Sequence, residues 1–147
     1  GFLYEGGVRV PLCARWPGAI RPGTTTDEVA NSNDLFDTIL EATERGAKEQ
    51  LAVAGPRRDG RSLLPIFAGT KMKEWPVFWH YPHYSNQGGK PGGAVRRGDY
   101  KLIEFYEDGR RELFDLRKDP SESRNLKAEK PDVATVLAAE LARWRKE

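Results

Sequence analysis

Apolar and polar residues alternate along the second half of the chain in the pattern of a β-sheet. Successive side chains of a strand point to opposite faces, and Tyr100–Tyr106 follows this period of two. Asp108 and Gly109 favour a tight hairpin turn, because glycine adopts positive φ without a steric cost. We therefore predict about four antiparallel strands, over residues 76–81, 93–98, 99–106 and 111–116.

Two other segments carry apolar residues at the spacing of one helical face. In residues 31–46, Asp34 and Asp37 lie in the predicted first turn and Gly46 ends the helix. The last helix is predicted to begin at Pro131, where the missing N–H of proline costs nothing. The stripes expected to face a core are Leu35, Phe36, Ile39 and Leu40 in the first helix, and Val133, Val136, Leu137, Leu141 and Trp144 in the last.

The first half of the chain contains one predicted strand, Val8–Trp16, which Pro17 and Gly18 bring to a turn. One strand and one helix cannot form a sheet, and an unpaired strand leaves backbone groups unsatisfied. We therefore expect residues 1–70 to be a remnant of a larger α/β domain, and residues 71–147 to form an α+β subdomain whose helix packs on its sheet. In the isolated chain, the exposed strand would fray or associate with a second copy.

Composition narrows the class of protein. Hydrophobic residues make up 38% of the chain and charged residues 31%, which is typical of a globular domain and not of a disordered one. The net charge of +2 is too small for a dedicated nucleic-acid binder. No apolar run approaches the roughly 18 residues that span a bilayer, so we expect neither nucleic acid nor membrane as a partner. The chain opens at Gly1 without an initiator methionine, which suggests a piece of a longer protein.

Residues 78–106 hold both histidines of the chain, and His80 and His83 are candidate substrate ligands. Imidazole donates and accepts hydrogen bonds and can carry charge near neutral pH. A zinc pair is disfavoured, because Pro82 separates the two residues and no Cys/His cluster supplies further ligands. Two structural histidines held by backbone groups are the remaining alternative.

Aromatic residues with polar tips surround these histidines. Such rings bind sugars by stacking and hydrogen bonding, but they also fill cores. Alternation places Trp79 and Tyr81 on one face of the strand, and Phe78 and His80 on the other. The glycines of residues 88–93 with nearby lysine and arginine could accept an anion, or they could form a simple connector.

No complete catalytic apparatus is visible in the chain. Cys13 lies within an apolar run and is expected to be a buried, inert thiol. As the only cysteine, it also excludes an internal disulfide. No serine occupies a G-x-S-x-G turn, so a Ser-His-Asp set cannot be assigned.

Five stretches, taken in order, resemble the C-terminal portion of sulfatases of the arylsulfatase type. Each motif alone is weak, but the ordered set extends over nearly the whole chain and is specific. The stretches are YEGGVRVPLCARWPG (4–18), NDLFDTILEAT (33–43), DGRSLLPIFAG (59–69), AVRRGDYKLI (94–103) and RELFDLRKDPSESRNL (111–126).

The resemblance implies an alkaline-phosphatase-like fold. In that fold a large mixed sheet flanked by helices precedes a small four-stranded antiparallel sheet with a C-terminal helix. The implied reaction is sulfate ester hydrolysis by a formylglycine, which is made from the first residue of C/S-x-P-x-R, with a calcium ion held by Asp and Asn. A periplasmic or secreted location is also implied.

The motifs that carry the catalytic and calcium-binding residues of the family are absent from this sequence. Cys13 is followed by Ala14, Arg15 and Trp16, so the modified-cysteine motif is absent. The calcium aspartates would lie upstream, and the active-site lysine of K-G-x-x-Y-E-G-G would immediately precede Gly1. We therefore expect a fragment that is inactive alone, with no catalytic residue, metal ligand or cofactor of its own.

The role left for this chain is to complete the fold and line the substrate entrance. A sulfated small molecule or carbohydrate is the implied partner. A stand-alone module that binds a glycan or a protein is the competing hypothesis, and phosphoester hydrolases of the same fold are a third. The residues expected to contact substrate are His80, His83 and Tyr84, with Asn86 and Gln87 in support.

Overall fold

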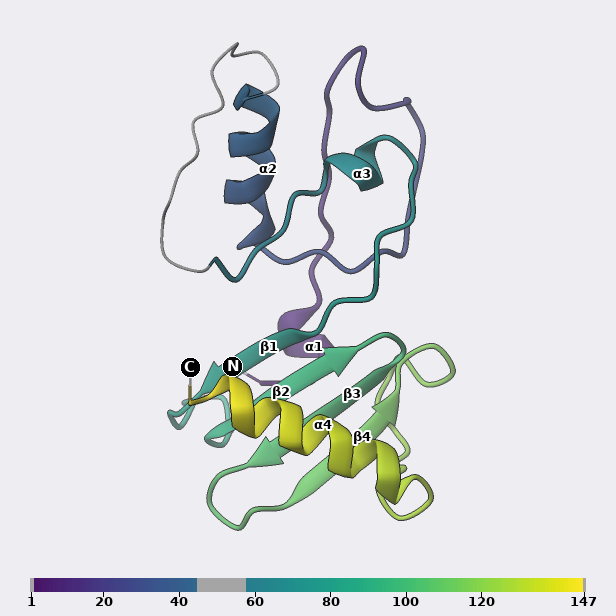
Figure 1. The fold of residues 1–147 in the computed structure, drawn as a ribbon. Coiled ribbons are helices and arrows are strands. Elements are labelled where there is room, and N and C mark those ends of the chain that lie inside the picture. The colour runs from purple at the N-terminus through teal and green to yellow at the C-terminus, as the bar shows by residue number, and fades with distance from the viewer. Residues whose placement is uncertain (1, 45–57, 147) are drawn as a thin grey trace. The chain divides into compact units, whose positions relative to one another are not determined.

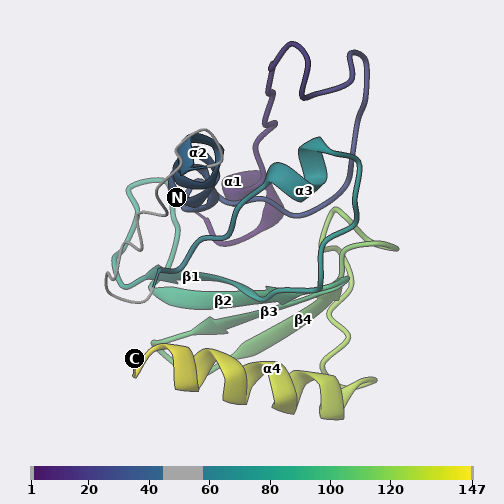
Figure 2. The same ribbon diagram turned by 45° about the horizontal axis from the view of Figure 1, so that its top comes forward.

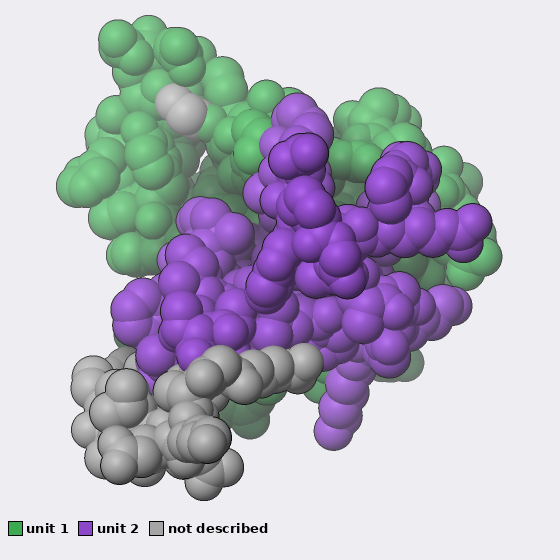
Figure 3. All heavy atoms as spheres, turned by 90° about the horizontal axis from the view of Figure 1, so that it is seen from above, with its two compact units in different colours: residues 1–10, 74–147 green, residues 11–73 purple. Residues whose placement is uncertain are grey.

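The computed structural model describes residues 2–44 and 58–146. The chain divides into two compact units, coloured separately in Figure 3. We call residues 1–10 and 74–147 the sheet unit, and residues 11–73 the helical unit. Residues 1–10 thus belong with the sheet, although we predicted them to be part of the remnant domain over residues 1–70.

The sheet unit contains the predicted antiparallel sheet, with four strands in the order β1-β2-β3-β4 (Figure 1). Each strand pairs with its neighbour in sequence, and Gly109 supplies a φ of +66° in the turn between β3 and β4. The alternation of apolar and polar residues and the turn signals therefore predicted the four-stranded antiparallel sheet correctly. The strands are β1 (Val77–Tyr81), β2 (Gly92–Arg97), β3 (Tyr100–Phe105) and β4 (Arg111–Asp115).

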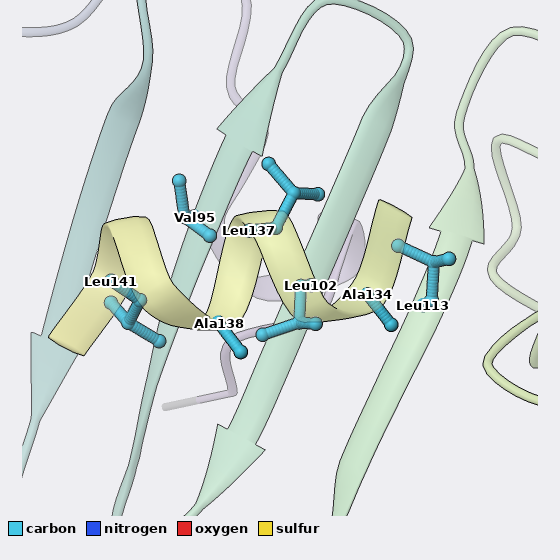
Figure 4. Close-up of a cluster of buried hydrophobic side chains, with 7 residues drawn as sticks. All are labelled: Val95, Leu102, Leu113, Ala134, Leu137, Ala138 and Leu141. Atoms are coloured by element: carbon cyan, nitrogen blue, oxygen red, sulfur yellow. The ribbon is translucent and has the colours of Figure 1, made fainter. Parts of the chain in front are cut away.

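Helix α4 (Pro131–Trp144) lies across one face of this sheet, as predicted (Figures 1 and 2). Pro131 stands at its start, and the ring of Phe78 stacks on that of Trp144. Val136 was expected in the apolar stripe but is 59% exposed, because it lies on the solvent side of the helix. The core under α4 consists of Val95, Leu102, Leu113, Ala134, Leu137, Ala138 and Leu141 (Figure 4).

The N-terminal segment covers the opposite face of the sheet (Figure 2). It includes the short helix α1 (Glu5–Val8), and Leu3 packs in a second core cluster beside it. Trp79 and Tyr81 pack against this cluster, whereas Phe78 packs against the first, so the predicted division of faces is confirmed. The buried members of the second cluster are Leu3, Ala94, Ile103, Phe105, Phe114 and Leu116.

The helical unit contains α2 (Asp34–Glu44) and the single helical turn α3 (Leu64–Phe67). Asp34 is buried and its carboxylate accepts the backbone N–H groups of Asn31 and Arg61. Thr38 accepts the N–H of Leu63 at 2.8 Å. These bonds give α2 a polar attachment to the DGRSLLP stretch. The predicted helix end, Gly46, lies outside the described residues.

The prediction of a strand over Val8–Trp16 is wrong. Residues 9–16 follow α1 without regular secondary structure. A strand needs a hydrogen-bonding neighbour, and no described residue pairs with this segment. Cys13 is exposed, which overturns the expected burial of its thiol for the same reason.

Apolar side chains of the helical unit are uncovered. Leu35, Phe36 and Ile39 were expected to face a core, but they are 41%, 61% and 64% exposed. Leu12 and Trp16 are 54% and 42% exposed. The helical periodicity correctly placed Leu35, Phe36 and Ile39 on one face of α2. Among the described residues, however, no core covers that face.

Candidate functional site

The predicted site residues lie at the end of β1 and in the loop that joins β1 to β2. This loop turns back on itself, because Ser85 N–H donates to Gly89 O and Gly88 N–H donates to Ser85 O. Gly88 has a φ of +89°, a conformation that favours glycine. Asn86 and Gln87 lie at the turn and are exposed.

Tyr84 is attached to the turn between β3 and β4. Its hydroxyl donates to Glu107 Oε1 at 2.8 Å, and Lys90 Nζ lies 2.9 Å from Glu107 Oε2. The Glu107 hydrogen bond raises the pKa of Tyr84, while the hydrogen bonds from Lys90 and Tyr84 lower the pKa of Glu107. Tyr84 is nevertheless 70% exposed, so this aromatic residue is held in place while much of it is open to solvent.

His80 lies on the α4 face of the sheet and is bound by Tyr106. His80 Nδ1 is 2.7 Å from the Tyr106 hydroxyl, and the Arg145 guanidinium lies 5.0 Å from the Tyr106 ring centroid. Arg145 in turn pairs with Glu104 at 2.8 Å. A Cβ on Gly93 would lie 2.5 Å from the Tyr106 hydroxyl, so glycine at this position makes room for the contact.

His83 lies against the other face. Its ring meets that of Tyr81 edge-on, with centroids 6.1 Å apart and planes at 90°. Because Tyr81 and His80 point to opposite faces of β1, the two histidines do not converge as a pair. The structure therefore brings His83, Tyr84, Asn86 and Gln87 together in one loop and gives His80 a separate set of partners.

The described residues offer no metal centre and no membrane span. Within residues 2–44 and 58–146, no group of three or more His, Cys, Asp or Glu side chains is placed to hold a metal ion. In the same ranges, no helix has the length and apolar character needed to cross a bilayer. The calcium implied by the resemblance therefore has no fitting set of ligands in this part of the chain.

Sequence reasoning missed a buried charge cluster in the sheet unit. Lys101 is fully buried, and its Nζ lies 2.8 Å from Glu5 Oε1 and 3.0 Å from Glu122 Oε1. Beside it, the Tyr4 hydroxyl donates to Glu112 Oε2 at 2.6 Å. One signal was present: Lys101 shares the apolar face of β3 in the alternation pattern, where a lysine needs a partner.

The closing RKDPSESRNL stretch has a structural role. The Asp119 carboxylate accepts hydrogen bonds from the backbone N–H of Arg124 and from Ser123 and Ser121, and these lower its pKa to about 2. Asn125 Oδ1 accepts the N–H of Leu113. The stretch therefore shapes the connection from β4 to α4 and attaches it to the sheet.

Comparison with known proteins places the chain in a family. The family model for the C-terminal part of N-sulphoglucosamine sulphohydrolase matches residues 1–147. A sulfatase of Formosa agariphila is 35% identical over 98% of this chain, and human arylsulfatase A is 34% identical over 86%. The solved structure of BT4656 in complex with its substrate D-glucosamine-2-N,6-O-disulfate is similar over 90% of this chain, with 28% identity and a TM-score of 0.68.

The chain belongs to the sulfatase family. It spans only 28% and 27% of the length of the two sulfatases, and 27% of the BT4656 chain. The predicted resemblance to the C-terminal portion of arylsulfatase-type enzymes is thereby confirmed, as is the expected fold of antiparallel sheet and C-terminal helix.

Proposed function

We propose that this chain is the C-terminal part of a sulfuric ester hydrolase and forms part of its substrate entrance. The observation that carries the proposal is the family match over residues 1–147, together with coverage of little more than a quarter of each relative. In this role the sheet unit completes the fold and the loop between β1 and β2 borders the pocket.

The chain is inactive alone under this proposal. Sulfate ester hydrolysis in the family needs an activated nucleophile and a metal that neutralises the ester oxygens. The sequence has no C/S-x-P-x-R element, and Cys13 stands in a different context, followed by Ala14, Arg15 and Trp16. Formylglycine and calcium would come from residues outside this chain.

A sulfated carbohydrate is the substrate class that we propose. BT4656, to which this chain is similar, has D-glucosamine-2-N,6-O-disulfate as its substrate. The loop offers Tyr84, which is largely exposed, for stacking, and it carries the exposed residues Asn86 and Gln87. His83 lies next to Tyr81 and adds an imidazole that can donate or accept.

His80 has a different place in the proposed site. If the Tyr106 hydroxyl donates to Nδ1, Nε2 carries the proton and is left as a donor on an exposed ring. His80 would then contact a sulfated ligand through Nε2 only, in an orientation that Tyr106 sets.

The uncovered apolar surface of the helical unit supports the view that this unit is a remnant. The exposed side chains of Leu35, Phe36 and Ile39 form an apolar stripe of the kind that packs on a sheet. Residues 9–16 lack a strand partner. In the parent enzyme the large domain would supply a sheet that covers the apolar stripe and a strand that pairs with residues 9–16. In the isolated chain the segment Val8–Trp16 would favour self-association.

The experiment compares this chain with the longer polypeptide of its reading frame. Both are incubated with 4-nitrophenyl sulfate and with D-glucosamine-2-N,6-O-disulfate, and released sulfate is measured with and without a calcium chelator. We expect sulfate release from the longer protein only, and its loss on chelation. Sulfate release by residues 1–147 unaided would overturn the proposal.

The competing module hypothesis predicts a different result. A stand-alone glycan-binding domain would bind the disulfated glucosamine in calorimetry as the isolated chain, while no longer polypeptide with hydrolytic activity would exist. A phosphoester hydrolase of the same fold would release phosphate from 4-nitrophenyl phosphate faster than sulfate from the sulfate ester, since a fold alone does not fix the reaction.

A further inference from the structure

One residue from each strand contributes to a row that crosses the whole sheet. His80 of β1 pairs with Gly93 of β2, Gly93 with Glu104 of β3, and Glu104 with Arg111 of β4. Residues that pair across antiparallel strands point to the same face, so the row lies on the α4 face, as His80 does. Arg145, which follows α4, reaches the row through its contact with Glu104. The end of the helix and all four strands therefore meet at this row.

Two arginines bind the carboxylate of Glu104. Arg145 Nη2 lies 2.8 Å from Oε1, and Arg111 Nε donates to Oε2 at 2.7 Å. The side chains of Arg111 and Arg145 are 41% and 29% exposed, whereas that of Glu104 is 9% exposed, so a ligand from solvent meets the cations first. One negative charge offsets only one of the two positive charges. This pairing therefore leaves a net positive charge at the surface, which attracts anions.

Tyr106 contacts both His80 and Arg145. Its hydroxyl lies 2.7 Å from His80 Nδ1, and the Arg145 guanidinium lies 5.0 Å from its ring centroid. With the hydroxyl as donor to Nδ1, the imidazole carries its proton on Nε2 and presents this N–H as a donor. One tyrosine therefore holds an imidazole donor and a guanidinium close to the same ring. We call these residues the α4-face cluster: His80, Glu104, Tyr106, Arg111 and Arg145.

The end of β3 attaches this cluster to the loop between β1 and β2. Tyr106 N–H donates to Pro91 O at 3.0 Å, at the end of that loop. The next residue, Glu107, binds both Tyr84 and Lys90. The α4-face cluster and the loop that carries the predicted site are thus attached to two consecutive residues of the chain. These contacts hold the two sets of side chains at a fixed separation.

A purely structural role would need fewer charged groups. One arginine is enough to neutralise Glu104, and partly exposed ion pairs contribute little to stability because solvent screens them. The α4-face cluster has two arginines and a histidine, and all three present N–H donors. A guanidinium holds its donors in a planar fork that matches two oxygens of one anionic group. The composition of the cluster therefore fits an oxyanion ligand.

We propose that His80 and Arg145, with Arg111 beside them, form a subsite for a second sulfate group of the sugar substrate. The inference rests on the proposed function, in which the substrate is a sulfated carbohydrate, and it adds that the sugar carries two sulfates. His80 Nε2–H and the N–H groups of Arg145 that do not bind Glu104 donate to the sulfate oxygens. No bond is made or broken at this subsite, so it sets affinity and specificity for the substrate.

Two substrates of the full-length enzyme separate this subsite from the reacting sulfate. Arg145→Gln is expected to raise KM for D-glucosamine-2-N,6-O-disulfate at least about tenfold, because charge-assisted hydrogen bonds are lost. KM for 4-nitrophenyl sulfate, whose single sulfate is the group hydrolysed, should rise less than about threefold. Arg143→Gln is the matched control, since it removes the same charge from the same turn of α4, and it should match the wild type with both substrates. Equal changes in the two KM values, or no change in either, would overturn the proposal.

Nuclear magnetic resonance on residues 1–147 tests the cluster without enzymatic activity. The chain has only two histidines, so the ring signals of His80 are assigned by their loss in His80→Gln. We expect these signals to shift when D-glucosamine-2-N,6-O-disulfate is added and not when D-glucosamine is added. Unchanged signals in the wild type would overturn the inference, even if Arg145→Gln does not fold. A full-length wild type without sulfatase activity would overturn the proposed function and leave this measurement valid.

Discussion

The ring of Phe78 lies parallel to that of Trp144, with centroids 4.8 Å apart and planes 5° apart. This stack joins the edge strand β1 to the last turn of α4. It extends the core cluster of the sheet unit to the end of the helix, where Arg145 begins its contacts with Glu104 and Tyr106.

Trp144→Ala is expected to destabilise the sheet unit by about 3 kcal/mol, because it removes a large ring from a packed contact. Chemical denaturation followed by the remaining tryptophan fluorescence measures the change. Val136→Ala on the same helix is the matched control, since Val136 is 59% exposed and its truncation should cost less than about 0.5 kcal/mol. Equal effects of the two substitutions would contradict the described packing of α4.

Stability should fall between about pH 10 and pH 12 through Tyr4. Burial and the hydrogen bond to Glu112 raise the pKa of Tyr4 from 10.0 to about 12. The folded state therefore favours the neutral phenol, and this contribution is fully present below pH 10.0 and is lost as the pH rises through about 12. Melting temperatures measured across this range should show a steeper decline for the wild type than for Tyr4→Phe. Parallel curves would rule out the contribution.

Gly60→Ala should destabilise the helical unit by about 1–3 kcal/mol. A Cβ at this position would overlap the backbone carbonyl of Asn33, which cannot move without disturbing the start of α2. Gly6→Ala is the control, because nothing lies within 4 Å of a Cβ there. Circular dichroism melts of the two variants test this prediction, which fails if Gly60→Ala is as stable as Gly6→Ala.

Substitutions in the loop between β1 and β2 should affect substrate binding in the full-length enzyme. Tyr84→Ala removes an aromatic face that is 70% exposed, so we expect KM for a sulfated sugar to rise about tenfold while kcat changes little. Tyr84→Phe retains the ring, loses the bond to Glu107, and should have an intermediate KM. Unchanged KM in Tyr84→Ala would remove Tyr84 from the proposed site.

The sheet and α4 could be predicted from the sequence because their signals are local. Alternation, the Asp-Gly turn and a proline at a helix start each depend on a few neighbouring residues. Val8–Trp16 was predicted wrongly because a strand also needs a neighbour, which no described residue provides. Cys13 lies in the same segment. It was predicted to be buried because a neighbouring strand was expected to cover it, and it is exposed.

The candidate site was predictable in part. The histidines are close in sequence, and alternation indicated the face of His80, but not its bond to Tyr106, 26 positions away. The buried charge cluster around Lys101 escaped prediction because Glu5 and Lys101 are 96 positions apart. No sequence period connects residues at such separations. The participation of His80, His83, Tyr84, Asn86 and Gln87 in substrate binding remains a prediction.

The sheet is covered on one face by residues 2–8 and on the other by α4, which are the first and last parts of the sheet unit to leave the ribosome. Leu3 and Glu5 cannot find their partners until β3 has been translated, and Glu122 follows later still. About a hundred residues must therefore be synthesised before the apolar and charged side chains of this segment can be buried. Co-translational folding of this unit is expected to end with the closure of both faces in one late step.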